Sequence, residues 1–216
     1  MFTARSKQKD RWKYNVYAML TLFPSGSSAD FFIYNPENIG SGKRYMKKAL
    51  ANQGVENAEQ LRMRLEWQIS KGIRSVFAQM YQELCLLSAD QRVRRIEAEE
   101  DPNVRHELSV VNYYLRRMPP DGVGAYDYSS IVFCCLAGEK LGWLTAEEAQ
   151  MYAKQGVSLT REHFSNWHDY CFSFAVGLQF INADPENSDY VKDGAERIRR
   201  LLNFRKSPLN NKLFEA

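Results

Sequence analysis

The sequence predicts an all-α fold, a single compact domain of about eight or nine helices with at most one short strand. Three observations support this prediction. Apolar residues recur three and four positions apart through most of the chain. Residues that favour helix starts stand where these patterns begin, and glycine or proline stands where they end. Hydrophobic residues make up 44% of the 216 residues, which is enough for a buried core.

The N-terminal part of the chain carries the weakest signals. A helix is expected at 8–20, and the apolar run DFFIY at 30–34 is a candidate strand that has no partner strand. Another helix is expected at 43–53. We divide the chain into an N-terminal helix with an irregular segment, residues 1–45, and a helical domain, residues 46–216.

Two helices follow, with a glycine between them. Asn57 is the expected N-cap of a helix at 58–71. Gly72 is expected to end that helix in the left-handed conformation. The next helix, at 73–87, has one apolar stripe formed by Ile73, Val76, Phe77, Met80, Tyr81, Leu84 and Leu87.

Caps and prolines delimit the middle of the chain. Ser88 and Gln91 have the spacing of a capping box. Asp101 precedes a proline at the first position of a helix expected at 102–118, which two further prolines cannot continue. The run PPDGVG at 119–124 is the clearest loop in the sequence.

Residues 126–216 are expected to form three helices in addition to the most apolar one. The first covers 126–141 and ends at Gly142. The second begins with the capping box of Thr145 and Glu148. The third begins after Ser188.

The most apolar helix is expected at 166–182, with Ser165 as its N-cap. Gly177 lies in its middle, where glycine costs about 1 kcal/mol relative to alanine. We expect this glycine to allow a close crossing with the helix at 126–141, near the small residues at 137–138. The predicted inner face is Trp167, Tyr170, Cys171, Phe174, Leu178 and Ile181.

Composition limits the function classes. Lys and Arg number 29 against 26 acidic residues, and a net charge of +3 does not favour binding dominated by a phosphate backbone. The arginines at 116–117 and the basic residues at 197–206 are better explained as cations at helix ends, so nucleic acid is not an expected partner. No run reaches the ~18 apolar residues of a membrane span. The four cysteines are expected to be reduced and buried, which fits a cytoplasmic protein.

The segment IGSGKR at 39–44 raises the question of a phosphate-binding loop. A Walker loop requires Gly, four residues, and then Gly-Lys-Ser/Thr. Glu37 occupies the first glycine position, where a carboxylate would repel phosphate, and Arg44 occupies the hydroxyl position. Lys43 and the basic residues after it are therefore expected to form a solvated helix face, and no cofactor is predicted.

Metal binding and nucleophilic catalysis have little support. His163 and His168 are five residues apart, which separates them by about 140° around a helix. His168 and Cys171 do share a face, so a zinc site that includes Cys134 or Cys135 is an alternative, as is a Cys–His pair. Neither has a recognisable signature, and no metal is predicted.

The segment GAYDYSS at 124–130 is the strongest candidate site. Asp127 stands at a helix start beside two tyrosines. It is either an acid in the first turn, stabilised by the helix dipole, or a carboxylate at the mouth of a cleft between helices. The candidate binding residues are Tyr126, Asp127, Trp167 and His168, and no catalytic residue is assigned.

Four stretches of the chain resemble one known family: NQGVENAEQLRMRLEWQISKGIRSVF, AYDYSSIVFCCLAGEKLGWLTAEEAQ, FSNWHDYCFSFAVGLQF and LLNFRKSPLNNKLF. Together they look like the bacterial proteins grouped as domain of unknown function 1266, over about 50–214. The family's arginine three residues after its A-W-D aspartate is Ser130 here, which weakens an enzyme interpretation. Its tryptophan after S-P is Leu209. The resemblance implies a cytoplasmic, mostly helical protein and carries no established activity.

The expected function is binding of another protein without catalysis, as a regulator or an immunity-type protein. The alternative is an enzyme or small-molecule binder with a cleft around Tyr126, Asp127 and Trp167. A pocket with converging polar groups would favour the alternative. A flat exposed apolar patch would favour protein binding. No oligomeric state is predicted.

Overall fold

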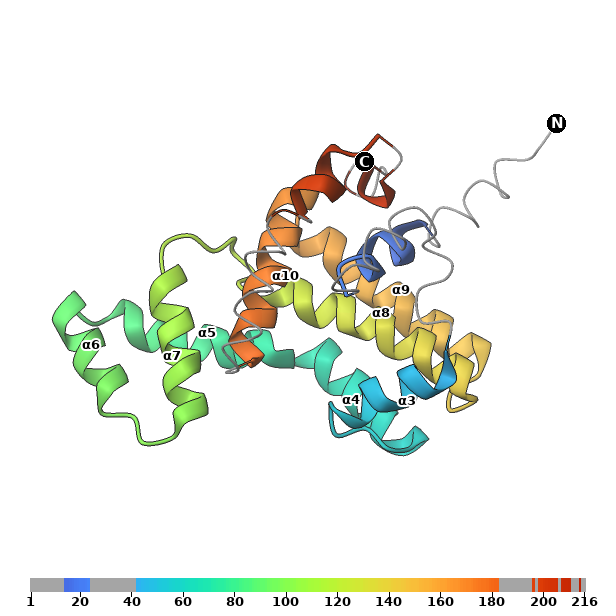
Figure 1. Ribbon diagram of the computed structural model, residues 1–216, viewed down its shortest axis with the longest axis horizontal. Coiled ribbons are helices and arrows are strands. Elements are labelled where there is room, and N and C mark those ends of the chain that lie inside the picture. The colour runs from blue at the N-terminus through green and yellow to red at the C-terminus, as the bar shows by residue number, and fades with distance from the viewer. Residues whose placement is uncertain are drawn as a thin grey trace.

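The computed structural model describes residues 14–23, 42–182, 196, 198–205, 207–210 and 214. These residues form helices and turns with no strand among them, which confirms the all-α prediction (Figure 1). The candidate strand at 30–34, the residues of the IGSGKR segment before Gly42, and Ser188 lie outside the described residues.

The helices follow the predicted order with small changes in their ends. Residues 14–20 and 198–203 are helical, as are eight longer segments and one short 3-10 helix. The predicted helix at 102–118 was too long, because it ends at Tyr114 and continues as turns. The bounds are α3 Lys43–Ala51, α4 Ala58–Ser70, α5 Gly72–Cys85, α6 Ala89–Glu97, α7 Pro102–Tyr114, α8 Gly124–Leu141, α9 Ala146–His163, α10 Trp167–Ile181 and η2 Pro208–Asn210.

Most helix starts are fixed by the caps that the sequence predicts. The side chains that accept from backbone N–H groups include Asn57, Ser88, Asp101 and Thr145. The predicted cap of α10 was wrong by one residue. Asn166 Oδ1 accepts from the N–H of Asp169 at 2.8 Å, while Ser165 Oγ accepts from the side chain of Asn166. Two adjacent residues of cap-forming type made the choice ambiguous.

Helix α8 is the central helix of the fold (Figure 1). Every residue from Gly124 to Cys135 is buried, because α3, α4, α5, α9 and α10 all pack against it. Its buried polar side chains have partners on different neighbours. Ser129 Oγ lies 2.5 Å from the hydroxyl of Tyr170 in α10, and Ser130 Oγ accepts from Gln68 of α4 at 2.7 Å.

Two apolar clusters form the core. The larger surrounds α8 and includes Ala18, Met19, Leu20 and Leu22, so the described residues 14–23 pack in the same core as the rest. The smaller lies between α5, α7 and the C-terminal part of α10, with Phe77, Val111 and Phe180 among its members. The boundary between 1–45 and 46–216 stays a prediction.

Helices α8 and α10 cross closely, but at a different point from the one predicted. A Cβ atom at Gly177 would lie 2.6 Å from Cβ of Tyr126 and 3.3 Å from Cβ of Val123. The glycine therefore faces the start of α8 and not residues 137–138. Ile181, predicted to face inward, is exposed at the end of α10.

Three of the four cysteines, Cys134, Cys135 and Cys171, are free and buried as predicted. Cys85 is free but exposed, because it is the last residue of α5 and lies beyond the core. None of the described helices is both long and apolar enough to cross a lipid bilayer.

Candidate functional site

The candidate site is organised around a sharp junction between α4 and α5. Helix α4 ends at Ser70 and α5 begins at Gly72, so only Lys71 separates them. Gly72 has a φ of +65°, a conformation that favours glycine. No side chain of its own segment caps α5. The free N–H and C=O groups at the two helix ends therefore need partners from elsewhere.

An ion pair between Asp127 and Arg74 supplies these partners. The Asp127 carboxylate accepts from the backbone N–H groups of Ile73 and Arg74, both at 3.0 Å, so α8 caps α5. The Arg74 guanidinium donates to the carbonyls of Gln68 at 2.6 Å and Ile69 at 2.7 Å, in the last turn of α4. Arg74 Nη1 also lies 3.3 Å from Asp127 Oδ2. One pair of side chains thus connects α4, α5 and α8.

Asp127 is completely buried, with 0% of its side chain exposed. Burial raises the pKa of Asp127 to about 6, although the N–H groups of Arg74 and Ile73 and the Arg74 charge oppose the rise. The carboxylate is therefore ionised at neutral pH. Of the two interpretations from the sequence, this arrangement matches the structural one, an acid in the first turn of a helix. Asp127 lies in the first turn of α8 and also caps the N-terminus of α5.

Gly72 makes room for this carboxylate. A Cβ atom at position 72 would lie 2.2 Å from Asp127 Oδ2 and 2.6 Å from Arg74 Nη1. The positive φ and the close approach therefore both require glycine at this position.

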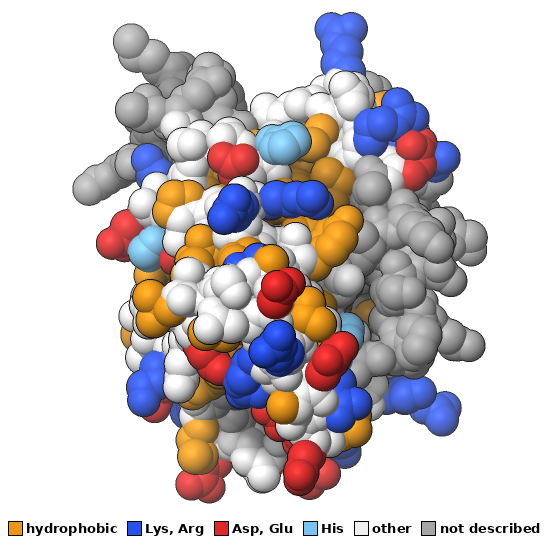
Figure 2. All heavy atoms as spheres, turned by 90° about the vertical axis from the view of Figure 1, so that its left-hand side faces the viewer, with side chains coloured by type: hydrophobic (Ala, Val, Ile, Leu, Met, Phe, Trp, Pro, Cys, Tyr) orange, Lys and Arg blue, Asp and Glu red, His pale blue; other side chains and the backbone are white. Residues whose placement is uncertain are grey.

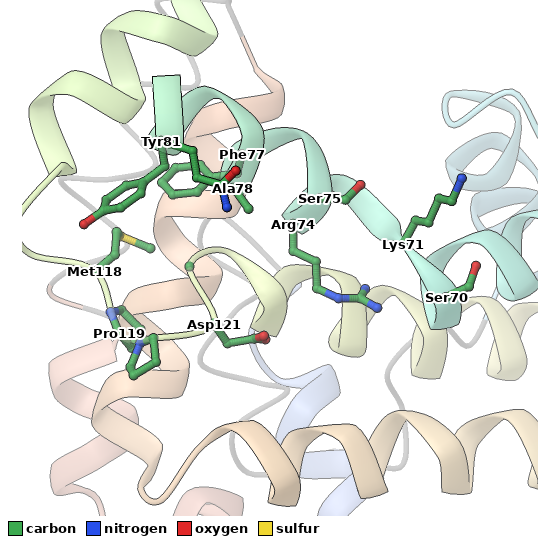
Figure 3. A pocket seen from close by; sticks show the side chains of 13 residues that line it. Ser70, Lys71, Arg74, Ser75, Phe77, Ala78, Tyr81, Met118, Pro119 and Asp121 are labelled. Carbon is green, nitrogen blue, oxygen red and sulfur yellow. The ribbon is translucent and has the colours of Figure 1, made fainter. Parts of the chain in front are cut away.

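A cleft of about 560 Å³ opens beside Arg74, between α5 and the loop at 118–122 (Figure 3). In the view of Figure 3, Phe77, Tyr81 and Met118 lie at one end of the cleft, and Arg74 and Asp121 lie toward the other. The complete lining is Ser70, Lys71, Arg74, Ser75, Phe77, Ala78, Tyr81, Gln82, Met118, Pro119, Pro120, Asp121 and Gly122.

The Asp121 side chain is only 15% exposed and is held by two neighbours. The Tyr128 hydroxyl donates to Oδ2 at 2.8 Å, and His163 Nδ1 lies 3.3 Å from Oδ1. Burial raises the pKa of Asp121, while Tyr128, His163 and Arg74 lower it. The Arg74 guanidinium carbon lies 5.2 Å from the ring centre of Tyr128, so this tyrosine contacts both charged groups of the cleft.

A second cavity of about 440 Å³ lies on the other side of the same loop. His163 lines this second cavity and pairs with Asp121, which lines the first cleft. Pro119 and Pro120 line both cavities. The loop at 118–122 therefore separates two cavities that are joined by one acid–histidine contact. The other residues of this cavity are Arg161, Glu162, Phe164, Ser165, Asp169 and Phe214.

The four candidate residues from the sequence do not meet in one site. Tyr126 and Trp167 are buried in the larger core cluster. Asp127 lies below the cleft and acts on it through Arg74. The His168 side chain is 80% exposed, and its nearest acidic partner is the adjacent Asp169, at 3.6 Å. A binding role for these four residues stays a prediction.

The sequence contained signals for the residues that were missed. Arg74 follows Gly72 within the first of the four stretches quoted above, and Asp127 belongs to the second, so two of these stretches meet at this junction. Asp121 lies in the PPDGVG loop that the sequence identified. Among the described residues, no three His, Cys, Asp or Glu side chains are grouped so that they could hold a metal ion.

Comparison with known proteins supports the resemblance. The sequence model of a family described as "Protein of unknown function (DUF1266)" matches residues 51–213, which is most of the chain. No curated protein matches the chain. No solved structure matches it either.

Proposed function

This chain belongs to the DUF1266 family of proteins of unknown function, and we propose that it binds a small organic molecule in the cleft between α5 and the loop at 118–122. The observation that carries this proposal is the lining of the cleft. An apolar wall and a polar end with charges of both signs border a single space of about 560 Å³. Ligand sites typically have volumes of roughly 300–1,000 Å³ and this combination of apolar walls with a few placed polar groups.

The polar end is organised before any ligand binds. Arg74 is fixed by the two carbonyls of α4 and by the buried Asp127. A guanidinium has five N–H donors. The three donors engaged in these bonds leave two without a partner among the described residues. A charged group that is already held in place loses little conformational entropy on binding.

Protein binding, the function first expected from the sequence, has weaker support. The exposed large apolar side chains are spread over different elements. On the face that Figure 2 shows, hydrophobic areas, the larger one at the upper right, are interspersed with charged side chains. The exposed apolar residues are Tyr14, Tyr45, Met63, Val76, Leu86, Val93, Tyr113, Met151 and Ile181.

A fragment screen with a blocked cleft tests the proposal. Ala78 is an exposed alanine that lines the cleft, and Ala78→Trp should fill part of it. Ala89→Trp places the same side chain on an exposed alanine of α6, outside the cleft, as a control. Ligand-observed NMR should show fragments that bind the wild type and the control but not Ala78→Trp. The proposal is wrong if no fragment binds or if Ala78→Trp binds the same fragments.

A further inference from the structure

We infer that the ligand of this cleft is a zwitterion of the amino-acid type, with an ammonium and a carboxylate on the same carbon atom and an apolar side chain. This inference rests on the proposed function and names its ligand class. Three parts of the lining carry it: the carboxylate of Asp121, the guanidinium of Arg74, and the apolar wall.

Asp121 is the group that would accept the ammonium. It lines the cleft, and its only ionic contact within 4.0 Å among the described residues is with His163. Tyr128 adds one neutral hydrogen bond. A mostly buried carboxylate without a lysine or arginine partner gains most from a cationic ligand that donates hydrogen bonds to it.

Arg74 is the group that would receive the carboxylate. It lines the same cleft, and its charge acts on Asp121, so the two opposite charges border one space. Figure 3 shows both side chains among those that line this space. A simple amine would leave the two remaining N–H groups of Arg74 without an acceptor, and a simple acid would leave Asp121 without a cationic partner from the ligand. A ligand that carries both charged groups on one carbon atom matches both residues.

Charges of both signs lie at this end of the cleft. Lys71 and Arg74 contribute two positive charges at this end of the cleft. Asp121 and the Arg74 partner Asp127 contribute two negative charges. Charges of both signs around one space favour a ligand that carries both signs.

The apolar wall is the group that would receive the side chain. Phe77, Tyr81, Met118 and Pro119 lie at the other end of the cleft (Figure 3). Aromatic rings and a methionine favour an aromatic or large aliphatic group through burial of apolar area and through ring and sulfur contacts. L-Phenylalanine is therefore a suitable probe.

Isothermal titration calorimetry with three related probes tests the ligand class. L-Phenylalanine carries both charges, phenethylamine lacks the carboxylate, and 3-phenylpropanoate lacks the ammonium. We expect L-phenylalanine to bind at least tenfold more tightly than either analogue. Equal or tighter binding of one analogue, or no binding of L-phenylalanine, would overturn the inference.

The variant Asp121→Asn separates ligand recognition from a structural role. It should weaken binding of L-phenylalanine at least tenfold and leave binding of 3-phenylpropanoate unchanged or tighter. Asp90→Asn, an exposed acid on α6, is the control and should change neither. If Asp121→Asn weakens all probes equally, Asp121 only holds the loop through Tyr128 and His163, and the assignment of the ammonium site is wrong.

A second variant covers the case in which Asp121→Asn does not fold. Met118→Ala keeps both charged groups and removes part of the apolar wall. It should weaken L-phenylalanine several-fold more than it weakens L-alanine, and an equal effect on both would contradict the assigned wall. The inference alone fails if fragments occupy the cleft while these probes show no preference for the zwitterion. The proposed function fails as well if Ala78→Trp changes no binding.

Discussion

Replacement of Gly72 by alanine tests the α4–α5 junction most directly. Two separate penalties are expected. The backbone has a φ of +65° at this position, and a residue with a Cβ atom pays roughly 1–2 kcal/mol for the left-handed conformation. The new Cβ would also lie 2.2 Å from Asp127 Oδ2, so the buried carboxylate would have to move away from Arg74 and from the N–H groups that it caps.

The second penalty can be isolated with matched glycines. Gly54 and Gly142 have φ values of +74° and +76°, and a Cβ at either position would meet nothing within 4 Å. Their alanine variants should therefore cost only about 1 kcal/mol of unfolding free energy, after the stabilising effect of alanine on the unfolded state is subtracted. Disruption of a buried ion pair costs roughly 3–5 kcal/mol. Gly72→Ala should therefore cost about 4–6 kcal/mol.

Urea denaturation followed by circular dichroism at 222 nm measures these differences at pH 7. A double-mutant cycle then identifies the cause. Asp127→Ala removes the carboxylate that the new methyl group displaces, so the double variant Gly72→Ala/Asp127→Ala should cost about 2–3 kcal/mol less than the sum of the single variants. The described contact is refuted if Gly72→Ala lowers the unfolding free energy by the same amount as the two control variants, within about 0.5 kcal/mol. It is also refuted if the two single variants add strictly in the double-mutant cycle.

Three further predictions concern protonation, thiol reactivity and packing. The pKa of Asp127 is raised from 3.8 to about 6, so the folded state binds this proton more tightly than the unfolded chain. The contribution of this group to stability should therefore fall as the pH rises from about 4 to about 6, and Asp127→Asn should flatten the measured pH dependence there. Burial raises the pKa of Cys134 to about 11, so a thiol reagent at pH 8 should modify Cys85 rapidly in the native protein and all four cysteines only in urea. Gly177→Leu should cost about 1–3 kcal/mol in urea denaturation because its side chain would overlap Tyr126, and a neutral result would contradict the close crossing.

The sequence predicted the helices well because their starts depend on local chemistry. Asn57 and Thr145 cap through bonds to residues three positions later, which a linear reading detects. The end of α7 was missed because residues 115–117 form turns although no residue after Tyr114 forces a stop before the prolines.

The candidate site was harder to predict because its contacts are distant in sequence. Asp127 and Arg74 are 53 residues apart, and Asp121 and His163 come from different elements. Periodicity identifies which face of a helix is buried, but it does not identify the neighbour that the face meets. Asp127 was a candidate from the sequence. Arg74, the residue that it positions, was identified only from the packing of α4, α5 and α8 in the structure.

The chain path through α5, α6 and α7 has a consequence for local stability. Residues 72–118 form one continuous excursion in which α5 packs against α8 and α4, α7 packs against α10, and the chain returns at the loop of the cleft (Figure 1). Such a segment can open as one cooperative unit while the larger core stays folded. Amide hydrogen exchange of Ile73 and Arg74, which donate to Asp127, should report the free energy of that opening. Because α5 forms one wall of the cleft, a bound ligand should slow exchange throughout this unit more than in α8 and α9.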